Sequence, residues 1–89
     1  MKLTSEEIIE QMEQFKEGQV VKFNIPEIFG GGVGIIGLNP DYPGPGQKKY
    51  LLKLGDDEKR AGEASPYWAT DKPKDLAKWV ADRQGDQIG

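Results

Sequence analysis

The segment that decides the fold is residues 19–38, QVVKFNIPEIFGGGVGIIGL. Side chains in residues 19–25 alternate between the two sides of an extended chain, which predicts a strand. Pro26 ends this strand because proline lacks the amide that a sheet needs. A second strand is predicted over residues 33–38, which are apolar apart from their glycines. The side chains of the first strand that we expect to face a core are Val21, Phe23 and Ile25.

The alternation resumes in residues 48–54 and predicts a third strand. Between the second and third strands, residues 39–46 (NPDYPGPG) contain three prolines and are predicted to form a loop. Residues 55–66 are rich in charge and are predicted to be another loop. A short strand at the edge of the sheet is predicted over residues 67–70. The side chains of the third strand expected in the core are Tyr50, Leu52 and Leu54.

A helix is predicted before the strands, over residues 4–18. Thr4 and Glu7 have the spacing of a capping box, in which each side chain accepts a hydrogen bond from the other residue's backbone amide. Gly18 is expected to end the helix. Between the capping box and Gly18, apolar residues recur at helical spacing, so that one face of the helix is expected to pack against the sheet. These residues are Ile8, Ile9, Met12 and Phe15.

A second helix is predicted from about residue 72 to 84, with Thr70 or Asp71 as its cap. The order of elements is therefore α-β-β-β-(β)-α. Strands joined by loops too short for a crossover helix pair antiparallel. We therefore predict a single α+β domain over residues 1–89. It is a two-layer sandwich in which an antiparallel sheet of three to four strands carries two helices on one face.

Composition excludes several classes of function. The chain has 12 Lys and Arg against 15 Asp and Glu, and its net charge of −3 argues against a general binder of nucleic acid or anionic membranes. It has no Cys and no His, which removes thiolate metal sites and the commonest general base. We therefore predict no enzymatic activity, no metal and no cofactor. Without an apolar span or a signal peptide, the expected location is the cytoplasm.

Two glycine motifs in the second strand are rejected. Residues 32–37, GVGIIG, match the G-x-G-x-x-G pattern of dinucleotide-binding folds, but that pattern must open a helix and here a proline-rich loop follows. Residues 34–37 match the G-x-x-G loop of KH domains, which must lie between two helices. A turn near Gly32 and Gly34 that holds a small anion on backbone amides stays open as a hypothesis.

One face of the predicted sheet is not covered by helices and carries Lys22, Lys49 and Lys53. Lysines keep such a face soluble and block pairing at its edge, but they also suit an anionic partner. Leu51 lies among them and adds the apolar area that a protein interface needs. The other apolar side chains assigned to this face are Val20, Ile36 and Leu38.

The order of elements is also that of double-stranded-RNA-binding domains, which place lysines at the start of their second helix on phosphates. Lys72, Lys74 and Lys78 occupy comparable positions. In that arrangement the acidic first helix would face the RNA, and the chain has no histidine for the minor-groove loop. RNA binding therefore ranks below a protein interaction.

Three aromatic residues lie near predicted loops, namely Tyr42, Tyr67 and Trp68. Exposed rings are recognition anchors, whereas rings at such positions also cap the open end of a small core. The leading prediction is a non-enzymatic interaction or accessory domain that binds another macromolecule through its helix-free sheet face or its glycine- and proline-rich loops. The alternative is binding of nucleic acid or a small anion by the lysine-bearing face. A protein partner is favoured over nucleic acid, and no membrane partner is expected.

Overall fold

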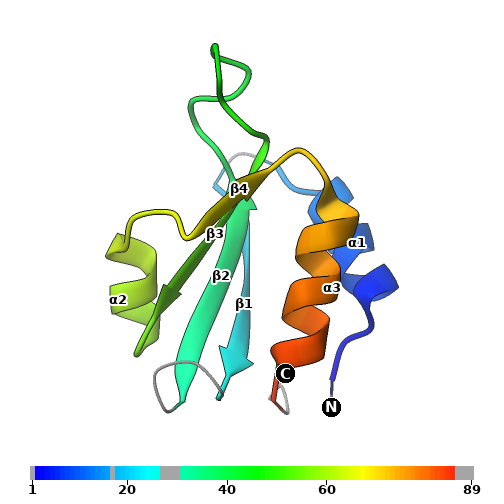
Figure 1. The fold of residues 1–89 in the computed structure, drawn as a ribbon, viewed down its shortest axis with the longest axis vertical. Coiled ribbons are helices and arrows are strands. Elements are labelled where there is room, and N and C mark those ends of the chain that lie inside the picture. The colour runs from blue at the N-terminus through cyan, green and yellow to red at the C-terminus, as the bar shows by residue number, and fades with distance from the viewer. Residues whose placement is uncertain (1, 17, 27–30, 86–89) are drawn as a thin grey trace.

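The computed structural model describes residues 2–16, 18–26 and 31–85 of the 89-residue chain. Four strands form one antiparallel sheet in the order β1-β2-β3-β4, so the chain runs as a meander from one edge to the other (Figure 1). The predicted α+β sandwich is confirmed. The strands are β1 (Val20–Ile25), β2 (Gly32–Leu38), β3 (Tyr50–Gly55) and β4 (Trp68–Thr70), and the helices are α1 (Ser5–Glu13), α2 (Glu58–Glu63) and α3 (Pro73–Arg83).

Helices α1 and α3 lie side by side on one face of the sheet, where the core forms (Figure 1). Each helix turns its apolar stripe toward the sheet because residues three and four apart share one side of a helix. Burial of this apolar surface is the dominant favourable contribution to folding. None of the helices in the described part of the chain is long and apolar enough to cross a bilayer. The core residues that are at most 2% exposed are Ile8, Met12, Phe23, Ile25, Ile36, Tyr50, Leu52, Leu76, Ala77 and Val80.

Hydrogen bonds fix the end of the helical layer where α1 begins and α3 ends. The predicted capping box is present, with Thr4 Oγ1 accepting from the Glu7 amide at 3.2 Å and Glu7 Oε1 accepting from the Thr4 amide at 3.0 Å. Next to this cap, the Leu3 amide donates to Gln84 Oε1 at 3.0 Å, and Gln84 Nε2 donates to the Leu3 carbonyl. The segment before α1 is therefore joined to the residue that follows α3.

Helix α1 is shorter than predicted. It ends at Glu13, with Gln14 as its C-cap, rather than reaching Gly18. Beyond the helix, the Phe15 ring meets the Tyr50 ring edge-on with 6.5 Å between centroids. Phe15 therefore still packs against the core, as its place in the apolar stripe predicted, although it lies outside the helix.

Thr70 and Asp71, which were predicted to cap α3, accept hydrogen bonds from other backbone amides. Lys72 occupies the N-cap position and makes no side-chain capping bond. Thr70 Oγ1 accepts from the Lys72 amide at 3.0 Å, and Asp71 Oδ1 accepts from the Lys49 amide at 2.8 Å. Pro73 has no amide at the first helical position, so α3 has one donor fewer to cap.

Helix α2 occupies the segment that the sequence predicted as a charged loop. It lies on the opposite face of the sheet from α1 and α3 and packs against β2 and β3 (Figure 1). Asp57 caps it by accepting from the Arg60 amide at 2.8 Å. Its buried residue is Ala61. A six-residue helix with one buried side chain has no apolar stripe, so the sequence periodicity does not reveal it.

The two faces of β2 are exchanged relative to the prediction, which was wrong for this strand. Ile36 was expected on the helix-free face, but it is buried under α1 and α3, in register with Val21 and Leu52. Ile35 lies on the opposite face instead, and Leu38 packs against the core. Because β2 is apolar on both sides, alternation does not distinguish its faces, and a shift of one residue exchanges them.

Candidate functional site

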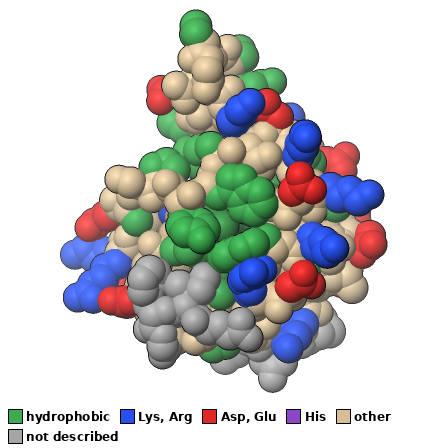
Figure 2. Space-filling view, viewed as in Figure 1, with side chains coloured by type: hydrophobic (Ala, Val, Ile, Leu, Met, Phe, Trp, Pro, Cys, Tyr) green, Lys and Arg blue, Asp and Glu red, His purple; other side chains and the backbone are tan. Residues whose placement is uncertain are grey.

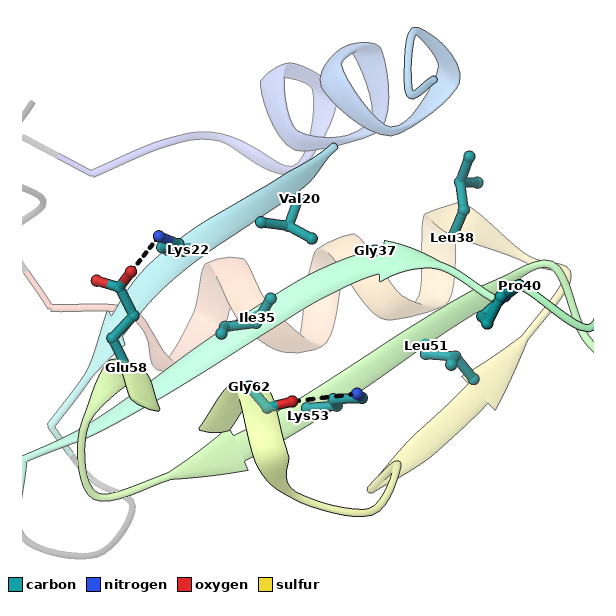
Figure 3. Close-up of a pocket in the computed structure, with 10 residues that line it drawn as sticks. All are labelled: Val20, Lys22, Ile35, Gly37, Leu38, Pro40, Leu51, Lys53, Glu58 and Gly62. Atoms are coloured by element: carbon teal, nitrogen blue, oxygen red, sulfur yellow. Dashed lines mark hydrogen bonds and ion pairs between the residues drawn. The ribbon is translucent and has the colours of Figure 1, made fainter. Parts of the chain in front are cut away.

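The sheet face turned away from α1 and α3, which we call the outer face, contains the candidate site. Helix α2 covers part of this face and leaves a groove of about 320 Å³ beside it, the outer groove (Figure 3). The groove crosses β1, β2 and β3 and is bounded by α2. Its volume lies at the lower end of the range for ligand-binding sites and also suits one or two side chains of a partner protein.

Two rows of residues in register form the floor of the outer groove. The first row is Val20, Gly37 and Leu51, and the second row is Lys22, Ile35 and Lys53. Directly opposite residues on neighbouring strands have Cβ atoms about 4.5–5.5 Å apart, so each row is a continuous strip. Gly37 has no side chain, so the groove reaches the backbone at the centre of the first row, where the Val20 side chain lies alongside: a Cβ atom built at Gly37 would be 3.0 Å from Val20 Cγ1 (Figure 3). The exposed fraction rises from 8% at Ile35, in the middle of the sheet, to 47% at Val20 on the edge strand.

Both lysines of the second row contact α2. Lys22 Nζ forms an ion pair and hydrogen bond with Glu58 Oε1, at the first residue of the helix. Lys53 Nζ donates to the Gly62 carbonyl at 3.3 Å, near the last residue of the helix. The two lysines therefore hold the two ends of α2 (Figure 3). Their role as candidate binding residues stays a prediction, and the structure shows that both contact the helix that forms one wall of the groove.

Helix α2 lies very close to the end of β3. A Cβ atom built at Gly55 would be 2.3 Å from the Ala61 backbone nitrogen. Only a residue without a side chain permits this approach, since ordinary carbon contacts are about 3.5–4.0 Å. The width of the outer groove therefore depends on a close backbone contact as well as on the lysines.

The acidic residues that precede and begin α2 have structural partners. Arg60 Nη1 pairs with Asp56 Oδ2 at 3.1 Å, and the Asp57 carboxylate caps the helix. Glu58 pairs with Lys22. Within the residues that the structure describes, no group of three or more carboxylate, histidine or cysteine side chains is placed to hold a metal ion.

Lys49, the third lysine predicted on this face, lies apart from the outer groove. It precedes β3, and its ammonium group is 5.4 Å from the centroid of the Tyr50 ring. It borders a separate hollow at the base of the proline-rich loop, together with Tyr42, which is 44% exposed. The structure thus brings Lys22, Leu51 and Lys53 together and leaves Lys49 outside the site.

The two glycines considered as loop binding residues lie within β2. Gly32 pairs with Ile25, and Gly34 pairs with Phe23 on one side and Leu54 on the other. Both glycines are buried. A Cβ atom at Gly34 would be 2.4 Å from Ile25 Cδ1, so this glycine makes room for a core side chain. Anion binding by these glycines stays a prediction that their placement in a buried strand does not favour.

Tyr67 and Trp68 belong to an aromatic cluster between β4 and α3. The Tyr67 ring is tilted against Trp79 with 5.7 Å between centroids, and the Trp68 ring meets Trp79 edge-on at 6.5 Å. The Arg83 guanidinium lies 4.4 Å from the Trp79 ring centroid. Figure 2 shows hydrophobic side chains gathered on this side of the molecule, beside the charged surface of α3. Trp68 packs against the core, whereas Tyr67 is 62% exposed.

Sequence reasoning missed part of the groove. Ile35 was assigned to the other face, and Glu58 and Gly62 were placed in a loop. The alternation of charge in β1 and β3 signals Lys22 and Lys53, but nothing comparable marks the residues of α2. The contact of Lys22 with Glu58 joins residues 36 positions apart, which becomes visible only once the chain is folded.

Comparison of the chain with models of protein families, with curated proteins and with solved structures finds no match in any of the three. The features of the molecule that bear on function are therefore the outer groove and the residues around it.

Proposed function

We propose that this protein is a non-enzymatic interaction domain that binds another protein through the outer groove. The observation that carries the proposal is the row of Val20, Gly37 and Leu51, an apolar strip that has no side chain at its centre and reaches the edge of the sheet. Partner side chains that cover this strip would remove apolar surface from water, which contributes about 25 cal/mol per Å².

The surroundings of this strip also suit a protein interface. Protein interfaces combine an apolar centre with a polar rim. In the outer groove the centre is supplied by Ile35 and Leu51, and the rim by Lys22, Lys53 and Glu58. The charges of these three rim residues sum to +1, so the rim favours a partner with a carboxylate near its apolar side chain.

Binding of nucleic acid or a small anion by the lysines is the weaker alternative. The pairing of Lys22 with Glu58 leaves the groove residues a net charge of only +1, which suits a single carboxylate but not the several phosphates that a nucleic acid presents. Lys49 lies outside the groove and adds no charge to it. The two functions differ in their response to salt, because affinity for nucleic acid falls steeply with ionic strength whereas an apolar interface changes little.

The proposal is tested by photo-crosslinking the full chain in living cells. A benzophenone amino acid is placed at Val20, which is exposed at the edge of the groove, or at Lys78 on the far helical layer as a control. Proteins crosslinked only through position 20 are identified by mass spectrometry, then purified, and their affinity for the unmodified domain is measured by calorimetry.

Leu51→Asp is expected to weaken that affinity at least tenfold, while Lys78→Glu leaves it unchanged. Val20→Asp serves as a second groove variant because Val20 is half exposed and lies outside the core. Circular dichroism confirms that each variant is folded. Equal crosslinking at positions 20 and 78, or full affinity in both groove variants, would show that the outer groove is not the binding site.

A further inference from the structure

We propose that the partner contributes an extended segment that pairs with β1 as a fifth strand and carries an apolar and an acidic residue two positions apart. This inference rests on the proposed function and specifies the partner's chemistry. It follows from the position of β1 at the edge of the sheet, from the two rows that begin on this strand and from the charge of Lys22.

Strand β1 is one edge of the sheet, since the strand order begins with it. The Asn24 carbonyl accepts a hydrogen bond from the Gly85 amide at 2.9 Å, so Asn24 directs its backbone groups away from β2. Alternate residues of an antiparallel strand direct their backbone groups to the same side. The amides and carbonyls of Val20 and Lys22 therefore face the edge that no strand of the described residues covers, where an added strand would pair with them.

The contact with Gly85 also limits the length of the added segment. It occupies the edge at Asn24, so pairing is confined to the first half of β1, around Val20 and Lys22. Strand addition of this kind obtains affinity from main-chain hydrogen bonds and specificity from alternate side chains that enter pockets. The side chains next to the outer groove therefore decide which segment binds.

A residue opposite Val20 would extend the row that continues through Gly37 to Leu51, and a residue opposite Lys22 would extend the row that continues through Ile35. Opposite residues on paired strands point to the same face, and those two positions are two residues apart in the added strand. An apolar side chain fits the first position because it would lie beside the Val20 side chain, which is 47% exposed.

An acidic side chain fits the second position because it lies opposite the Lys22 ammonium group. The Lys22 side chain is 47% exposed although it contacts Glu58, so a second carboxylate can reach it. Opposite charges in directly paired positions stabilise a sheet, whereas like charges destabilise it.

A second copy of this chain fits less well than a different protein. If β1 paired with β1 of another copy, the residue opposite Lys22 would come from Val20–Ile25, which contains no Asp or Glu. Lys22 opposite Lys22 would be repulsive, whereas an acidic residue of another protein would pair with it. Formation of a homodimer through β1 at high protein concentration is therefore an outcome that would contradict the inference.

The test is a selection from a random heptapeptide library displayed on phage, using the full folded chain as bait. We expect enriched peptides to carry an apolar residue and Asp or Glu two positions apart, and to be lost on Val20→Asp. The decisive variant is Lys22→Glu. It should replace the acidic preference by Lys or Arg at the same position and leave the apolar preference intact. Lys59→Glu, an exposed change on α2, should leave the original preference unchanged.

Backbone pairing is tested separately with one enriched peptide. N-methylation of an amide that faces β1 should weaken binding about tenfold, whereas N-methylation of the next residue should have little effect, because alternate amides face opposite sides of a strand. Peptides that depend on Leu51 but ignore Lys22 and tolerate both methylations would overturn strand addition and leave the proposed function standing. If no Val20-dependent peptide is enriched, or if the chain associates with itself through β1, the inference is overturned. The crosslinking experiment then decides the proposed function on its own.

Discussion

Helix α2 and the end of β3 approach each other at Gly55 so closely that a side chain there must displace one of them. A Cβ atom at this position would be 2.3 Å from the Ala61 nitrogen and 2.7 Å from its Cα atom. Since carbon contacts are normally about 3.5–4.0 Å, α2 would have to move by roughly 1 Å. We expect Gly55→Ala to shift α2 and to alter the wall of the outer groove.

The cost of this change follows from two opposing effects. An extra methyl group in a packed site costs about 1–3 kcal/mol. Replacing glycine by alanine also restricts the unfolded chain, which favours folding by about 0.4–1 kcal/mol. We therefore expect Gly55→Ala to lower the free energy of unfolding by about 1–2 kcal/mol. The loss is limited because α2 buries Ala61 and can detach locally while the core stays folded.

Gly34→Ala is the matched control because it adds the same methyl group to a neighbouring strand. Its Cβ atom would be 2.4 Å from Ile25 Cδ1, which is the end of a flexible side chain rather than backbone. A rotation of Ile25 away from its preferred rotamer costs about 0.5–1.5 kcal/mol and is offset by the restricted unfolded chain. This variant should stay within about 1 kcal/mol of the unmodified protein.

Urea unfolding, followed by the fluorescence of the two tryptophans, measures these free energies. Amide chemical shifts of residues 58–63, measured by NMR spectroscopy, report whether α2 has moved. The reasoning is refuted if Gly55→Ala unfolds at the same urea concentration as the unmodified protein with unchanged α2 shifts. A greater loss of stability in Gly34→Ala than in Gly55→Ala would refute it as well.

Three further substitutions test other parts of the structure by urea unfolding. Thr4→Ala removes the α1 cap and should cost about 1 kcal/mol, and an unchanged midpoint would mean that the capping box does not stabilise α1. Glu58→Gln should cost less than about 1 kcal/mol, because the side chains of its ion pair with Lys22 are 64% and 47% exposed, and a larger loss would show that this pair dominates the attachment of α2. Leu52→Ala in the core should cost about 2–5 kcal/mol, and Leu51→Ala on the outer face less than half as much. The reverse order would contradict the assignment of the β3 faces.

The fold class could be predicted from local sequence patterns, and the structure has the strands that these patterns indicate. Charged and apolar side chains alternate in β1 and β3, so one face of each strand is unambiguous, and Phe23 and Leu52 are buried as predicted. Strand β2 lacks polar side chains, and its faces are set by hydrogen-bonded register with both neighbours. That information is not contained in β2 itself, which explains why Ile36 was assigned to the wrong face.

The candidate site could be predicted only in part for a related reason. Lys22, Leu51 and Lys53 were identified because each lies on a strand with clear alternation. Glu58 contributes through α2, a helix whose position depends on contacts with two strands and on the absence of a side chain at Gly55. Contacts of this kind join distant segments and leave no periodic pattern in the sequence.

The pair of hydrogen bonds between Leu3 and Gln84 makes the domain a suitable candidate for circular permutation. Because these residues already touch, a short linker can join them without disturbing either helix. New ends can be opened in the proline-rich loop between β2 and β3, which projects at the top of Figure 1. The Asn39 amide donates to the Lys49 carbonyl at 2.8 Å and joins the two sides of this loop where it leaves the sheet. Such a permutant retains every strand pairing and carries its ends on the loop. The same closeness of residues 3 and 84 allows the whole domain to be inserted into a surface loop of a host protein with both β1 and the outer groove still accessible.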